Sequence, residues 1–111
     1  MADALSTLGL AYRAKKLVLG EEVINRIGKV KLLFIASDIS EKSRERFEKK
    51  CHYYGIAHVD DFDSSQLSMA LGKNNVKVIG ITDEGFTQAI LKRIKEKEGR
   101  YGKTDIQKTS E

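Results

Sequence analysis

The sequence contains no tryptophan and no proline, and Cys51 is its single cysteine. One cysteine cannot form a disulfide within the chain, so nothing in the composition calls for an oxidising compartment. The longest apolar run, LLFIA at residues 32–36, is far shorter than the roughly 20 residues that cross a bilayer. The N-terminal residues also lack the charged start and long apolar core of a secretion signal. These absences predict a cytoplasmic protein that has no membrane partner.

The 111 residues suffice for one folded domain with one hydrophobic core. Hydrophobic residues make up 41% and charged residues 32% of the chain, as in an ordinary globular protein. Residues 97–111 are polar, contain two glycines and have no apolar face. We therefore predict a single domain over residues 1–96 and a polar, flexible tail over residues 97–111.

Helical and strand periodicities alternate along most of the chain, and turn or capping residues separate the segments. Helices are predicted over residues 4–14, 20–27, 41–54, 64–71 and 84–98, and strands over residues 16–19, 30–36, 56–59 and 76–82. Serines are expected to cap the third and fourth helices and Asp83 the fifth, whereas Gly28 should end the second. Phe47, Cys51 and Tyr54 should form the inward face of the third helix. This alternation favours a three-layer α/β/α sandwich around a small, mixed, four-stranded sheet.

The positive charge is concentrated in one segment. Between residues 13 and 31 there are six cationic and two anionic side chains, so this segment accounts for the whole formal net charge of +4. Such an excess is expected where a protein binds an anionic partner, through attraction to phosphates and release of counterions. A solvated basic face that binds nothing would explain the charge equally well.

Two acids, Glu21 and Glu22, lie inside this basic segment, directly after Gly20. One explanation is that they stabilise the start of the second helix through its dipole. The other is that their carboxylates accept hydrogen bonds from the amino and imino groups of a base edge. Lysines and arginines nearby would then hold the phosphates, and the glycine would permit close approach.

Enzymatic chemistry has no support in the sequence. Asp38 follows the central predicted strand, as the acceptor of a phosphoryl group would, but the acidic and lysine partners of such a site are missing. We therefore expect Asp38 to order a turn. Cys51, His52 and His58 with the following aspartates have no recurrent zinc spacing, and no nucleophile motif is present. We predict no catalytic residue, metal site or cofactor.

Five stretches in order, LGLAYRAKKLVLGEEV, KLLFIASDIS, KKCHYYGI, QLSMALGK and GITDEGF, resemble the kink-turn-binding ribosomal protein family. That family contains the archaeal L-seven-Ae and eukaryotic L-thirty-e proteins, and the resemblance is closest to its short bacterial, YlxQ-like branch. It covers residues 5–94. It implies an L-thirty-e-like α/β/α sandwich that binds RNA with a sharp kink carrying sheared G·A pairs.

The resemblance also assigns roles to residues. At the start of the second helix the family has asparagine, glutamate and lysine where this chain has Glu22, Val23 and Arg26. Residues 73–75 occupy the loop that in the family meets an extruded nucleotide. The predicted RNA-binding residues are Arg13, Lys15, Lys16, Gly20, Glu21, Glu22, Arg26, Lys29, Lys31, Lys73, Asn74 and Asn75.

We therefore expect a non-enzymatic, ribosome-associated protein whose partners are structured RNA and ribosomal proteins. The alternative is a protein-interaction module of the same fold. Such a module would dock ribosomal or transcription factors through the charged helix at residues 41–50.

Overall fold

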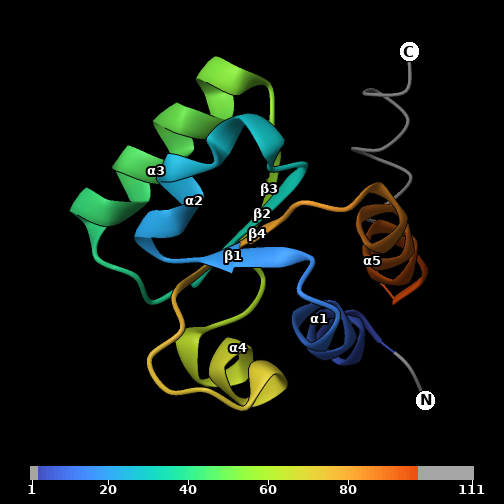
Figure 1. Cartoon of the computed structure of the whole chain (residues 1–111). Helices are drawn as coiled ribbons and strands as arrows, with labels where there is room; N and C mark the ends of the chain where they lie inside the picture. The colour runs from blue at the N-terminus through green and yellow to red at the C-terminus, as the bar shows by residue number, and fades with distance from the viewer. Residues whose placement is uncertain (1–2, 98–111) are drawn as a thin grey trace.

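A computed structural model describes residues 3–97 of the chain (Figure 1). Its elements are α1 (Ala4–Arg13), β1 (Leu17–Leu19), α2 (Glu21–Asn25), the 3-10 turn η1 (Ile27–Lys29), β2 (Leu32–Ile35), α3 (Glu41–Tyr54), β3 (Ala57–Val59), α4 (Ser64–Leu71), β4 (Val78–Ile81) and α5 (Glu84–Lys97). The tail expected at residues 97–111 lies outside the described residues, except that Lys97 still belongs to α5.

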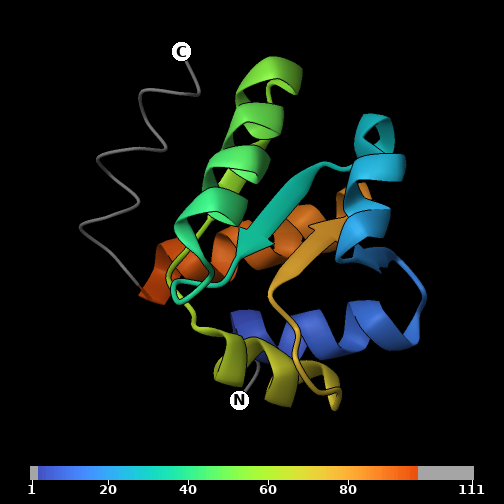
Figure 2. The same ribbon diagram turned by 90° about the vertical axis from the view of Figure 1, so that its left-hand side faces the viewer.

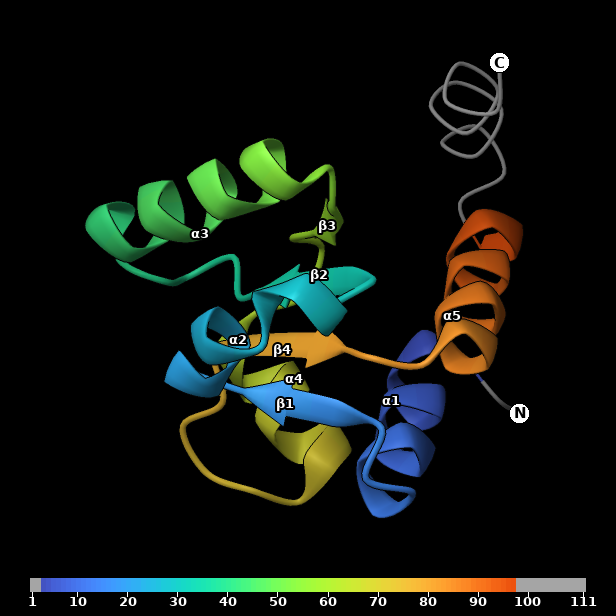
Figure 3. The same ribbon diagram turned by 45° about the horizontal axis from the view of Figure 1, so that its top comes forward.

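The four strands form one mixed sheet in the order β1-β4-β2-β3, which can be followed in Figure 3. β4 pairs antiparallel with both β1 and β2, whereas β2 pairs parallel with β3. β2 and β4 are thus the inner strands, and all of their residues are buried. For β2 the apolar run at residues 30–36 predicted this burial. The mixed, four-stranded sheet is confirmed.

Side chains alternate between the two faces of the sheet and create two core clusters. Leu32 and Phe34 face α1, α4 and α5, whereas Leu33 and Ile35 face α2 and α3. Figure 2 shows α2 and α3 on one side of the sheet and α1 and α4 on the other. The predicted three-layer α/β/α sandwich is therefore confirmed.

Most helix ends follow the predicted capping residues, but the start of α4 and the end of α2 differ. Ser40 and Asp83 cap α3 and α5 as expected, because their side-chain oxygens accept backbone N–H groups three residues on. α4 is capped by Asp63 rather than by a serine, in a reciprocal capping box with Gln66. Asp63 comes one residue before Ser64, and its carboxylate accepts the N–H of Gln66 at 2.8 Å.

The second helix is shorter than predicted. α2 ends at Asn25, because Arg26 leaves the helical conformation (φ −115°, ψ 26°) and the chain continues as η1. Gly28 lies inside this turn and is not a helix stop. Tyr54 is also not inward-facing as predicted: it is the last residue of α3, remains 46% exposed, and its ring contacts Tyr53 edge-on.

Within residues 3–97, none of the helices has both the length and the apolar character needed to cross a membrane.

Candidate nucleic-acid interface

Gly20 joins β1 to α2 in a backbone conformation that residues with a Cβ atom disfavour. Its φ of 55° and ψ of −132° fall where only glycine is unstrained. Its N–H donates to the carbonyl of Val78, and its own carbonyl accepts the N–H of Val23, the first turn of α2. Apart from the two neighbouring residues, no atom of the part of the chain that the structure describes lies within 4 Å of the position that a Cβ would occupy. The glycine is therefore required by the backbone, and it leaves the start of α2 open to a ligand.

The loop between α4 and β4 reaches the same end of the sheet (Figure 3). Gly20 and Glu21 line a hollow of about 370 Å³ together with Lys73, Asn74 and Asn75 of this loop. Asn75 has a φ of 58°, a left-handed conformation that asparagine adopts more readily than most residues. The structure thus brings five of the predicted residues together from two distant parts of the sequence.

Both acids of the basic segment are held by arginines. Glu21 accepts two hydrogen bonds from Arg46 of α3, at 2.8 and 2.7 Å. Glu22 accepts from Arg26 Nε at 2.9 Å and from Asn25 at 3.4 Å. These hydrogen bonds hold the pKa values of both carboxyl groups below their usual range, Glu21 through Arg46 and Glu22 through Arg26 and then Asn25. Both carboxylates are therefore ionised at neutral pH and act only as acceptors.

The remaining predicted cations lie at the other end of the sheet. The carbonyl of Lys16 accepts the N–H of Thr82, and the N–H of Lys31 donates to Ile81, so both lysines flank the end of β4. Lys73–Asn75 precede the start of β4. Along β1, four residue steps of about 3.3 Å separate Lys16 from Gly20, or about 13 Å. Every predicted residue is exposed. Arg13, Lys15, Lys16, Lys29 and Lys31 belong to this second group, and α2 with Glu22 and Arg26 connects the two.

Comparison with known proteins identifies the family. Residues 2–91 match the model of the ribosomal protein L7Ae/L30e/S12e/Gadd45 family. The chain belongs to this family. It is similar to the RNA-binding protein YlxQ of Enterococcus faecium, with 36% identity over 88 residues that cover 77% of this chain and 84% of the relative. The protein of the same name from Bacillus subtilis (strain 168) is 31% identical over 87 residues, which cover 76% and 87%.

Two solved structures share the fold of this chain. A Bacillus halodurans C protein of unknown function superposes with a TM-score of 0.78 and 35% identity, over 85% of this chain and 98% of that one. The Giardia lamblia 15.5kD RNA binding protein superposes with a TM-score of 0.65 over 86% and 84% of the two chains. Its identity of 18% shows a shared L7Ae-type fold only.

The sequence did not reveal Arg46 as part of this site. It lies 25 residues from Glu21, and no local pattern pairs them. A partial signal was present, because the helical period that buries Phe47 in the core leaves Arg46 on the surface. The L7Ae-type fold packs α3 beside α2 (Figure 1). The Arg46 guanidinium therefore reaches Glu21 in the first turn of α2.

Asp38 has a structural partner in another loop. Its carboxylate accepts the N–H of Ser64 at 2.8 Å and the hydroxyl of Ser64 at 2.7 Å. These bonds, led by the hydroxyl, lower the pKa of Asp38. We expected Asp38 to order its own turn into α3. It lies in that turn, and its carboxylate also ties the loop after β2 to the start of α4.

The cysteine and histidines do not converge. Cys51 is 2% exposed inside the α2–α3 core cluster, and its burial raises the pKa of the thiol to about 11. His52 is on α3, His58 is on β3, and both are exposed. Among residues 3–97 no three His, Cys, Asp or Glu side chains are grouped as a metal site would require.

Proposed function

We propose that this protein is a non-enzymatic RNA-binding protein that recognises a structured, kink-turn-like RNA. Membership of the L7Ae family and the names of the YlxQ relatives support RNA as the ligand. The observation that carries the proposal is the hollow where the start of α2 meets Lys73–Asn75, beside a segment holding the whole net charge. The RNA that we propose to test first is ribosomal RNA in the cytoplasm. Ribosomal proteins would then be further partners.

The cations and the acids have different roles in this proposal. The lysines contact phosphates, and these contacts set affinity and salt dependence but carry no sequence information. Glu22 uses only two acceptor positions for Arg26 and Asn25, so its carboxylate retains lone pairs for a base edge. Arg26 uses one of its five N–H groups on Glu22 and keeps the others for a phosphate. The acids and cations of this segment thus serve one ligand.

A carboxylate selects a particular kind of base edge. An asparagine side chain both donates and accepts, whereas the ionised Glu22 only accepts. The base that it contacts must therefore present amino or imino N–H groups, as guanine does. Each good base contact contributes about 1–3 kcal/mol of discrimination.

The test is a salt-titrated binding assay with a standard kink-turn RNA and with the same RNA after replacement of its G·A pairs. The variants are Glu22→Gln and Lys15→Ala/Lys16→Ala. Tight binding that requires the G·A pairs, and that Glu22→Gln weakens, is the expected result. The lysine variant should lose affinity for both RNAs alike and show a smaller salt dependence.

Two other outcomes would change the proposal. Equal, salt-sensitive binding to both RNAs would leave a basic RNA-binding protein that does not recognise the kink. Binding to neither RNA would refute the proposal and favour the protein-interaction module. Cosedimentation with ribosomes in a sucrose gradient tests the ribosomal source separately.

A further inference from the structure

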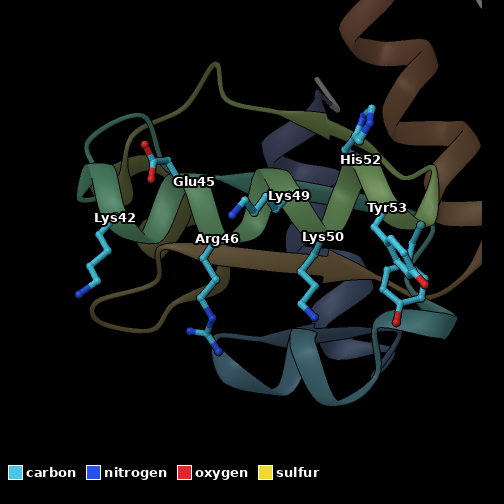
Figure 4. A pocket seen from close by; sticks show the side chains of 8 residues that line it. Lys42, Glu45, Arg46, Lys49, Lys50, His52 and Tyr53 are labelled. Carbon is cyan, nitrogen blue, oxygen red and sulfur yellow. The ribbon is translucent and has the colours of Figure 1, made fainter.

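The outer face of α3 presents a row of basic and aromatic side chains away from the core. Lys42, Arg46, Lys49, Lys50 and Tyr53 recur at helical spacing, and we call them the α3 basic face. They line an open hollow of about 650 Å³ (Figure 4). From the first to the last of them α3 rises by about 16 Å. This surface is long enough for several contacts with one extended ligand.

The aromatic end of this face is unusually exposed. Tyr53 is 80% exposed, and its ring meets that of Tyr54 edge-on, with centroids 4.9 Å apart and an interplanar angle of 80°. An exposed ring contributes little to folding, because it removes little apolar surface from water. Its free π-face is available for a nucleobase, and such stacking accepts any base.

The charge on this face suits a polyanion. Four cations line the hollow, and Glu45 is the one carboxylate among its lining residues. Arg46 also pairs with Glu21 at the start of α2, so this surface adjoins the candidate RNA site. Figure 4 shows Arg46 and Lys50 extending toward the same side of α3, where α2 lies. An RNA strand that extends from the candidate site at α2 would meet these cations next.

A protein partner suits this face less well. Three of its five members are lysines, and lysine is depleted in protein–protein interfaces, which are built around buried apolar side chains. Cations interleaved with an aromatic ring are the usual composition of surfaces that bind single-stranded nucleic acid.

We propose that the α3 basic face binds an unpaired RNA strand adjoining the kinked element, with a base stacked on Tyr53 and phosphates held by Lys42, Lys49 and Lys50. This inference rests on the proposed function in one respect, because it assigns both surfaces to the same RNA. It adds a second ligand class, flexible single strands, and residues outside the predicted set.

The test uses the full chain and three fluorescent RNAs. One is the kink-turn RNA, one is the same RNA with an unpaired extension of about ten uridines, and one is the oligouridine alone. The variants are Tyr53→Ala, Tyr53→Phe and Lys49→Ala/Lys50→Ala. The matched controls are Met69→Ala, which removes an equally exposed (80%) side chain, and Lys92→Ala/Lys95→Ala on α5.

The wild type should bind the extended RNA more tightly than the unextended one. Tyr53→Ala should lower the affinity for the extended RNA about tenfold and should not change the affinity for the unextended RNA. Tyr53→Phe and both controls should behave as the wild type. The salt slope is the change in the logarithm of the binding constant with the logarithm of the salt concentration. Lys49→Ala/Lys50→Ala should reduce its magnitude by about 0.7 for each phosphate that the variant no longer neutralises. Thermal unfolding confirms that each variant is folded.

The two proposals fail separately. If the kink-turn RNA is not bound but oligouridine is bound in a Tyr53-dependent manner, the α3 basic face stands and kink recognition falls. If the extension adds no affinity, or if Tyr53→Ala binds the extended RNA as its Met69→Ala control does, the α3 proposal is overturned. A protein ligand would then be the better explanation of this face.

Discussion

Replacing Lys15 by glycine should stabilise the fold and weaken RNA binding at the same time. Lys15 ends α1 in the left-handed conformation, with a φ of 61°. Its N–H donates to the carbonyl of Tyr12, and that of Lys16 donates to Ala11, which is the Schellman pattern. Glycine is the residue expected at this position. α3 and α4 end in the same conformation at Gly55 and Gly72.

The expected gain follows from backbone preferences alone. A non-glycine residue in the left-handed region costs about 1–2 kcal/mol. Glycine removes this cost in the folded state. It also gives the unfolded chain more conformational freedom, which lowers the free energy of unfolding by about 0.4–1 kcal/mol. The free energy of unfolding should therefore rise by about 0.8 kcal/mol, and Tm by about 3–4 °C. Affinity for the kink-turn RNA should fall, and the salt slope should decrease by about one if Lys15 contacts a phosphate.

Urea denaturation and salt-titrated RNA binding measure the two effects on the same variant. Gly55→Lys is the matched control. Among residues 3–97, apart from its chain neighbours, no atom lies within 4 Å of its Cβ position, so only the backbone term should act. It should destabilise the protein by a similar amount. Lys15→Arg should change neither property. If Lys15→Gly is stabilising but binds RNA as the wild type does, the charge of Lys15 has no role in binding. If it is destabilising, the strain argument is refuted.

Three further predictions concern the fold. Gly9→Ala should lower the free energy of unfolding in urea by about 1–3 kcal/mol, because the new Cβ would lie 2.8 Å from the backbone oxygen of Ala70; a gain in stability would contradict this. The coupling between Glu21 and Arg46, measured by a double-mutant cycle, should be present at neutral pH and be lost as pH falls below 4.5, because pairing lowers the pKa of Glu21. A coupling independent of pH would refute it. Cys51 should resist alkylation in the folded protein, and stability should decline as pH rises from 9.0 toward 11, because the unfolded thiol ionises first. Rapid labelling of the native protein would contradict its burial.

Local patterns predicted much of the fold because they reflect local physics. Short-range periodicity distinguished the buried strand at residues 32–35 from the helix at residues 41–54. The Ser40 and Asp83 caps act over three residues, so they were recognisable without tertiary information. The second helix was predicted too long, because Gly28 resembles a helix stop. The helix instead ends earlier, where Arg26 departs from helical geometry.

The sequence by itself determined the alternation of elements, the family and the location of the excess charge. Only the tertiary structure decided which charged groups meet. The strand order β1-β4-β2-β3 places Gly20 beside Lys73–Asn75 and puts Lys16 and Lys31 at the opposite end. The packing of α3 against α2 brings Arg46 to Glu21 across 25 residues of chain. Such contacts depend on how the layers assemble, and no short-range spacing encodes that assembly.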